Sequence, residues 1–308
     1  MRALEELELL QEDVRHGRAA CTSRSRLVRQ LLQMEEDLTG SAARSRDEIR
    51  AALPSERFHL LASKQLGCRL EKVRRIGACL ACTLRPCLCQ QLPPLRLRHR
   101  LWLLMHANEA LRTTNSGKLL LLAHPDATLL VRGIREHDRR LAELVQRPSA
   151  VVLYPDDDAL TPAECLARAQ RADVGEGGGV LDLIIIDGTW SQARMLARQL
   201  PSTVPRVALD LTALGTESRS LFGSSVRTQS AEREASGRVC TLEAYALLAE
   251  QIHEDPDETQ KLRLYLSRFI EALEPIRPTL HAAMKRRASV QSGSDGDGRD
   301  DDLEYVGG

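Results

Sequence analysis

The chain is 308 residues long and carries 43 lysines and arginines against 43 aspartates and glutamates, so its formal net charge is zero. A neutral total excludes a uniformly basic nucleic-acid-binding surface but leaves room for local patches. Aromatic residues make up only 3% of the chain, which argues against recognition through many stacked bases.

The charges are segregated along the chain. Residues 1–63 combine charged and helix-forming segments, with a polar break around Thr39–Arg46, and we interpret them as a helical accessory extension without chemistry. Between Lys64 and Arg112 there are ten lysines and arginines but two glutamates. The last residues are rich in Gly, Ser and Asp, a composition that cannot bury enough apolar surface to fold. The predicted divisions are 1–63, a basic segment 64–98, a folded domain 99–288 and a disordered acidic tail 289–308.

No run approaches the roughly 18 consecutive apolar residues of a membrane span. The N-terminus mixes acidic and basic residues and has neither a secretory nor a transit pattern. We therefore expect a cytoplasmic protein, or one that also enters the nucleus, with no membrane partner.

From residue 100 onward, short apolar runs bounded by turn residues alternate with helical patterns. Such runs are typical of strands buried on both faces of a parallel sheet. The predicted strands are 101–106, 128–133, 150–155, 180–187 and 206–210. The predicted helices are 134–146, 162–172, 191–200 and 242–254, the last with Thr241 as its N-cap. The fold class is therefore α/β, with a mainly parallel sheet, flanking helices and a ligand site outside the carboxyl ends of the strands.

Four of the eight cysteines form a CxxC pair and a CxC pair separated by four residues: Cys79, Cys82, Cys87 and Cys89. Four thiolates at this spacing can surround one tetrahedral Zn²⁺. An iron–sulfur cluster, a redox dithiol and four thiols near each other by chance are the alternatives. Zinc is favoured over iron–sulfur because nothing else in the chain indicates electron transfer. A zinc knuckle in a basic segment can hold RNA, and it can equally be a structural element.

The run VLDLIIID ends in Asp187-Gly188-Thr189-Trp190, which places Asp187 at the carboxyl end of a central strand and Trp190 at a helix start. A carboxylate there is costly to desolvate unless it has a partner or a task. Helix capping for Asp187 and core packing for Trp190 are the structural alternatives.

Two further polar clusters follow predicted strands. The first runs from His106 through Asn108, Glu109 and Arg112 to Lys118, and its Asn-Ser-Gly turn is typical of a ligand-lining loop. The second lies within 226–244, where a helix N-terminus can receive an anion. There is no GxGxxG, P-loop or HExxH motif, which disfavours nucleotide hydrolysis and zinc-protease chemistry.

In combination these motifs resemble the DTW-domain family of tRNA-uridine aminocarboxypropyltransferases. The resemblance covers residues 79–250 in six ordered blocks and departs from the family at Ala107, Ser116, Ser230 and the longer stretch 231–236. The blocks are the four cysteines, His106…Glu109…Arg112…Thr114-Asn115…Gly117, Leu153-Tyr154-Pro155, Asp187-Gly188-Thr189-Trp190, Arg227-Thr-Gln229 and Thr241-Leu-Glu243-Ala244.

The resemblance implies a SPOUT-like fold with a C-terminal knot, and transfer of the 3-amino-3-carboxypropyl group of S-adenosylmethionine to N3 of a tRNA uridine, with release of 5′-methylthioadenosine. The implied metal is a structural Zn²⁺ on the four cysteines, and the implied macromolecular partner is tRNA. The expected cofactor-binding residues are Arg112, Thr114, Asn115, Gly117, Tyr154, Pro155, Gly188, Thr189, Trp190, Arg227, Gln229, Thr241 and Glu243.

Asp187 is the expected catalytic residue, as the base for the uridine N3 proton or as the group that positions it. Arg112 and Arg227 are expected to bind either the methionine carboxylate or an RNA phosphate. Trp190 is expected to stack on adenine or uracil, or to pack beneath the site. A SPOUT-like RNA methyltransferase and a non-enzymatic zinc-knuckle RNA-binding protein are the alternative functions.

Overall fold

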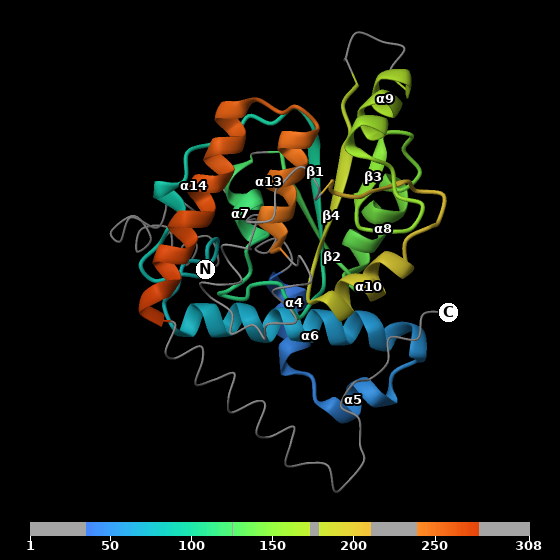
Figure 1. Cartoon of the computed structure of the whole chain (residues 1–308). Helices are drawn as coiled ribbons and strands as arrows, with labels where there is room; N and C mark the ends of the chain where they lie inside the picture. The colour runs from blue at the N-terminus through green and yellow to red at the C-terminus, as the bar shows by residue number, and fades with distance from the viewer. Residues whose placement is uncertain (1–34, 125, 173–178, 211–238, 277–308) are drawn as a thin grey trace, which may run out of the picture.

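The computed structural model describes residues 35–124, 126–172, 179–210 and 239–276 (Figure 1). The predicted helices before residue 35 and the predicted acidic tail lie outside them. The elements are α4 Glu35–Ala43, α5 Arg46–Ala51, α6 Pro54–Arg75, η1 Cys89–Gln91, β1 Arg100–Met105, α7 Lys118–Ala123, β2 Thr128–Val131, α8 Arg135–Leu144, β3 Ala150–Leu153, α9 Pro162–Ala172, β4 Asp182–Asp187, α10 Trp190–Arg198, β5 Arg206–Val207, α13 Thr241–Gln251, α14 Pro256–Leu273 and η3 Glu274–Ile276.

The five strands form one sheet in the order β2-β1-β4-β3-β5, and every pair of neighbours is parallel. The predicted α/β class and parallel sheet are therefore confirmed. Each of the five predicted strands exists, although β5 has only two residues. β1 and β4 are central and pair over six positions, from Arg100 with Asp182 to Met105 with Asp187.

Both faces of the sheet are covered, which explains the continuous apolar runs. On one face, Leu104, Ile184 and Val152 pack with side chains of α8 and α10. On the other face, alternate residues such as Leu103 and Ile185 join a larger core with side chains of α6, α7, α13 and α14. Figure 1 shows α8 and α10 on one side of the strands and α13 and α14 on the other. None of the helices in the described part of the chain has the length and apolar character that crossing a membrane requires.

The predicted helices agree with the structure to within a few residues, with one correction at an N-cap. Thr241 is the first residue of α13, and the N-cap is Cys240, whose backbone N–H donates to a Glu243 carboxylate oxygen at 2.7 Å. The Thr241 hydroxyl is therefore not used in capping. Its actual partner is the carboxylate of Asp187.

Helix α6 crosses the predicted division at residue 63 and packs directly against the sheet domain. Gly133, which follows β2, has a φ of +88°, and a Cβ there would lie 2.5 Å from the Cβ of Ala62 on α6. His59 on α6 hydrogen-bonds the Gly133 carbonyl oxygen at 2.9 Å. A glycine therefore both supplies the left-handed turn and permits close contact with α6.

At the amino end of β4, the carboxylate of Asp182 is fully buried and heavily hydrogen-bonded. It accepts two bonds of 2.7 Å from Arg100, one of 2.8 Å from Trp102 Nε1 and one of 2.6 Å from the Ser149 hydroxyl. Arg147 lies 3.3 Å away and over the Trp102 ring. Burial acts to raise the pKa of Asp182, but hydrogen bonds from Arg100, Ser149 and Trp102 outweigh it and lower the pKa to about 2.

We predict that Asp182→Ala lowers the free energy of unfolding by about 3 kcal/mol, because it removes several charge-assisted hydrogen bonds to a buried carboxylate at the amino end of β4. The pKa is depressed in the folded state, so this contribution is complete above the unfolded pKa of about 4. It is lost as the pH falls to about 2. Urea unfolding at pH 7 and pH 3 measures both effects. Glu143→Gln, at an exposed helix ion pair, is the control, and equal losses in the two variants would contradict the prediction.

Candidate active site

The carboxyl ends of β1 and β4 lie side by side, and the connections that follow these two strands lead to opposite sides of the sheet. From β1 the next strand, β2, lies on one side, whereas β3 and β5 lie beyond β4 on the other. The backbone N–H of His106 donates to the Asp187 carbonyl oxygen at 3.1 Å, which extends the pairing by one residue. Such a switch point is where open parallel sheets bind ligands. The two polar segments that follow these strands therefore meet where the sequence predicted chemistry.

Asp187 brings together three segments that are far apart in the sequence. Its carboxylate accepts hydrogen bonds from Asn115 Nδ2 and, at 2.5 Å, from the Thr241 hydroxyl. A Cβ on Gly117 would lie only 3.0 Å from the Asp187 Cγ, so the loop can approach the carboxylate because glycine stands there. The loop after β1, the end of β4 and the start of α13 thus converge on one carboxylate.

Asp187 is 3% exposed, and both of its carboxylate oxygens accept hydrogen bonds. A carboxylate in this environment holds its donors in place. Its hydrogen bonds hold the loop 106–118 and the start of α13 against the end of β4.

The loop 106–118 is itself internally bonded. Arg112 forms an ion pair with Glu109 at 2.5 Å, while its guanidinium side chain remains 29% exposed. Burial lowers the pKa of His106 to about 4, so its imidazole is neutral at physiological pH, and its Nδ1 accepts from the Asn108 N–H at 3.0 Å. Thr114 is half-buried beside Asn115. Of this loop, Arg112 and Thr114 are the predicted residues that retain access to solvent.

The segment after β4 begins helix α10 and exposes an aromatic side chain. Thr189 is the N-cap and forms a reciprocal capping box with Gln192. The cap is therefore Thr189 and not Asp187. Trp190 is 40% exposed although it lies three residues from a buried carboxylate, which excludes plain core packing. Gly188 is half-buried between them.

Of the remaining predicted residues, three lie in the described part of the chain and two lie outside it. Tyr154 is half-buried against the core on the α8 and α10 side, and Pro155 is exposed just after β3. Glu243 is buried, with its carboxylate bonded to the Cys240 N–H. Arg227 and Gln229 lie outside the described residues.

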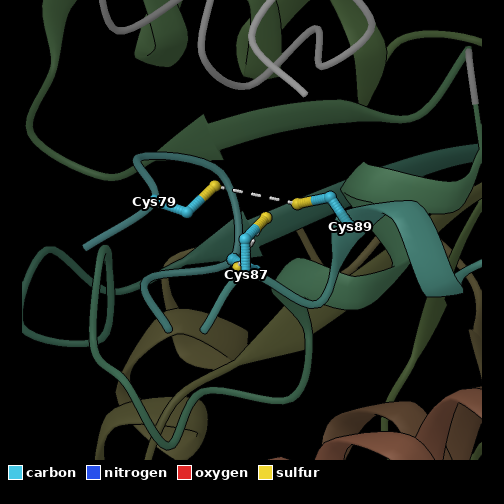
Figure 2. Close-up of side chains that lie close together, drawn as sticks. Cys79, Cys87 and Cys89 are labelled. Atoms are coloured by element: carbon cyan, nitrogen blue, oxygen red, sulfur yellow. Dashed lines mark hydrogen bonds between the residues drawn. The ribbon is translucent and has the colours of Figure 1, made fainter. Parts of the chain in front are cut away.

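The four predicted cysteines lie together and fit a tetrahedral metal. Their sulfur atoms all lie within 4.8 Å of one another, with Cys79 and Cys89 separated by 3.8 Å and Cys82 and Cys87 by 3.9 Å. Figure 2 shows the thiols of Cys79, Cys87 and Cys89 directed toward one another. Zn–S bonds of about 2.3 Å in a tetrahedron require sulfur separations of about 3.8 Å. These cysteines would hold a Zn²⁺ that stabilises the local fold.

The backbone around the cysteines is folded to support this arrangement. Thr83 has a φ of +58°, and its N–H donates to the Cys79 carbonyl oxygen at 2.7 Å, which closes the first turn. The Leu88 N–H approaches the Cys82 sulfur at 3.5 Å. Hydrogen bonds among the thiols lower the pKa of Cys82 and raise the pKa values of Cys79 and Cys89, so within this cluster Cys82 is the thiol that most readily becomes a thiolate.

Lys118, which the sequence marks only as the end of the polar cluster and to which it assigns no role, lies between the cysteines and the loop. It is 3% exposed and opens α7, with its ammonium bonded to Thr83 and to two loop carbonyls. Burial lowers the pKa of Lys118 to about 7, whereas negative charge on Cys82, Cys89, Cys79 and Asp187 acts to raise it. The available signal was a lone cation at the start of the apolar run LLLLA, directly after the predicted ligand loop.

Fold and site together define an α/β domain with a candidate ligand site at its sheet switch point and an adjacent cluster of four cysteines that can hold a metal. Its family follows from comparison. The DTW domain model matches residues 77–274, well over half of the chain, and the chain belongs to this family. The resemblance seen in the sequence is confirmed.

Three curated relatives are each named tRNA-uridine aminocarboxypropyltransferase 2. The Drosophila melanogaster protein is 27% identical over 64% of this chain and 75% of its own length. The Macaca fascicularis and Mus musculus proteins are 29% and 30% identical, over 47% and 42% of this chain. The matches span less than half of the mammalian relatives' lengths, at 49% and 43%. No solved structure is significantly similar to the chain.

We predict that the purified chain carries about one zinc ion and that Cys82→Ser loses it, because a fully buried ligand cannot be replaced by solvent. Metal loss should also lower the melting temperature, since metal binding stabilises the folded state. Elemental analysis and thermal unfolding measure the two effects. Cys68→Ser, at an exposed thiol outside the cluster, is the control. Full zinc content in Cys82→Ser would refute the assignment.

Proposed function

We propose that this protein transfers the 3-amino-3-carboxypropyl group of S-adenosylmethionine to N3 of a tRNA uridine, forming 3-(3-amino-3-carboxypropyl)uridine and releasing 5′-methylthioadenosine. The observation that carries the proposal is the convergence of three family blocks on the Asp187 carboxylate at the sheet switch point. Membership of the DTW-domain family and the shared name of the curated relatives support it.

The reaction is a displacement at carbon. The uridine N3 forms a bond to the methionine Cγ, the Cγ–S bond breaks with its electron pair on sulfur, and the N3 proton passes to a base. S-adenosylmethionine supplies the activated sulfonium, which also has electrophilic methyl and ribose C5′ carbons. The protein's task is therefore to present Cγ and to shield the methyl group, and orientation alone can contribute several kcal/mol of barrier reduction.

The exposed side chains around the switch point provide groups for this task. Trp190, 40% exposed, offers a ring face on which adenine or uracil can stack. Arg112 offers a partly exposed guanidinium to the methionine carboxylate or to an RNA phosphate. Arg227, which lies outside the described residues, is proposed for the same role. Thr114, Tyr154, Pro155, Gly188 and Thr189 are proposed to line the cofactor site.

For Asp187 we propose positioning in preference to proton abstraction. Its carboxylate is 3% exposed and already accepts from Asn115 and Thr241. A base must come within hydrogen-bond reach of the proton it takes. Holding the loop and α13 in register needs no such access, and it explains why three blocks meet at one side chain.

The proposed tRNA contact is the basic segment beside the cysteines. Lys72, Arg74 and Arg75 are exposed at the C-terminal end of α6, and Arg96 and Arg98 are exposed in the irregular stretch before β1. Guanidinium and ammonium groups neutralise phosphates without reading sequence. The reacting uridine must leave its stack to reach a site at a sheet edge. A tRNA substrate is compatible with a cytoplasmic or nuclear location.

We further propose a SPOUT-like arrangement with a C-terminal knot. The all-parallel sheet and the return of α13 to the carboxyl end of β4 support it. The connecting residues 211–238 lie outside the described part of the chain. The predicted division into a basic knuckle segment 64–98 and a catalytic domain 99–288 stays a prediction, with α6 joining the first to residues before 64.

We predict that the chain transfers label from the aminocarboxypropyl group of S-adenosylmethionine, and not from its methyl group, to unmodified tRNA. Methylthioadenosine should appear in equal amount, because breaking Cγ–S leaves that thioether. Scintillation counting of RNA with each labelled cofactor, and nucleoside mass spectrometry, measure this. Methyl label in RNA would identify a methyltransferase. tRNA binding without any cofactor turnover would identify a non-enzymatic RNA-binding protein.

We predict that Thr241→Val lowers transfer by about 100-fold and raises KM for S-adenosylmethionine, because losing one donor to Asp187 misplaces α13. Thr241→Ser keeps the hydroxyl and should stay near wild type. Asp187→Asn should behave as Thr241→Val does. If Asp187→Asn lowers only kcat, and Thr241→Val has no effect, Asp187 is the base and the positioning role is wrong.

A further inference from the structure

Lys118 spans the space between the cysteine cluster and the Asp187 site. Its ammonium donates to the Thr83 hydroxyl at 2.6 Å, to the Thr113 carbonyl oxygen at 2.7 Å and to the Arg112 carbonyl oxygen at 3.1 Å. Three acceptors match the three N–H groups of an ammonium. One acceptor belongs to the residue directly after Cys82, and two belong to the loop that carries Asn115.

The backbone of Lys118 continues the connection. Its N–H donates to Asn115 Oδ1 at 2.9 Å, and Asn115 Nδ2 donates to Asp187. The Asn115 amide is thereby fixed at both ends, so its orientation depends on where Lys118 lies. An unbroken series of hydrogen bonds runs from the cysteine turn, through Thr83 and Lys118, to the carboxylate at the switch point.

Burying an ammonium costs free energy unless hydrogen bonds and nearby negative charge offset the cost. Lys118 is 3% exposed, and its Nζ lies 5.0 Å from the centre of the Phe269 ring. Four thiolates around a divalent metal leave a net negative charge on the cluster. The metal-loaded cluster is therefore a counter-charge for Lys118.

We propose that Lys118 is a positioning residue that couples the metal-loaded cysteine cluster to the Asn115–Asp187 contact. The coupling rests on the proposed function where it concerns S-adenosylmethionine, since the contact organises the proposed cofactor site. Linkage is reciprocal, so zinc tightens cofactor binding by the same factor as the cofactor tightens zinc binding. The zinc ion then stabilises the active site as well as the knuckle.

The first experiment needs no cofactor. Zinc release to a chromogenic chelator is followed in the full chain and in Lys118→Met, Thr83→Val and Thr83→Ser. Thr83→Val removes the hydroxyl at nearly constant volume, whereas Thr83→Ser retains it and is the matched control. We expect release at least tenfold faster in Lys118→Met and Thr83→Val, and near the wild-type rate in Thr83→Ser. Wild-type rates in both test variants, or no zinc in the wild-type chain, would overturn the proposal.

The second experiment measures whether the coupling reaches the loop. Amide hydrogen exchange of residues 106–118 is compared in zinc-loaded and zinc-depleted chain, and in zinc-loaded Thr83→Val and Thr83→Ser. Depletion and Thr83→Val should both accelerate exchange in this loop, while α8 on the opposite face of the sheet stays protected. Unchanged exchange in the loop on depletion would overturn the proposal.

Calorimetric titration with S-adenosylmethionine then separates this inference from the proposed function. The zinc-loaded wild type should bind at least tenfold more tightly than the depleted chain, and Lys118→Met should bind weakly whether or not zinc is present. Equal affinities of loaded and depleted wild type would refute the coupling. No binding to the zinc-loaded wild type would refute the proposed function, and the release and exchange measurements would still decide the role of Lys118.

Discussion

The site depends on the hydrogen bonds that the buried carboxylate of Asp187 accepts. A charged group at the end of a central strand is costly to bury, and the cost is offset here by donors that come from two other parts of the chain, Asn115 and Thr241. The same requirement that stabilises the buried charge therefore assembles the site. Because β1 and β4 are neighbours in register up to Met105 and Asp187, the loop after β1 reaches the carboxylate directly.

Strand β4 carries a buried carboxylate at each end, and the two are satisfied in different ways. Asp182, at the amino end, is held by two arginines, a serine and an indole N–H. The two hydrogen bonds described for Asp187, at the carboxyl end, come from an amide and a hydroxyl, which are neutral donors. Strong ion pairs suit the end of a sheet that only needs to be stable. Neutral donors on a loop and a helix start suit the end where ligands enter parallel sheets.

Local sequence pattern was enough to predict the strands, four helices and the clustering of the four cysteines. Strands buried on both faces appear as short apolar runs, and metal-binding thiols appear as closely spaced cysteine pairs. The strand order and the partners of Asp187 were not predictable, since Asn115 and Thr241 are separated from it by 72 and 54 positions. Lys118 was missed because a single lysine beside LLLLA indicates a helix boundary, and its three acceptors are created only by tertiary folding. The sequence predicts Thr241 as the N-cap of α13 because threonine is a favoured capping residue. In the structure the Thr241 hydroxyl donates to Asp187 instead, and Cys240 is the N-cap.

The neutral net charge of the chain conceals an asymmetry between interior and surface. In the segment before β1, Leu95 and His99 are buried while Arg96 and Arg98 are exposed. The backbone N–H groups of these two arginines donate to the buried carboxylates of Glu258 and Glu254. Acidic side chains are thus used internally, to fix the backbone that displays basic ones. A balanced composition is for this reason compatible with exposed basic side chains such as Arg96 and Arg98.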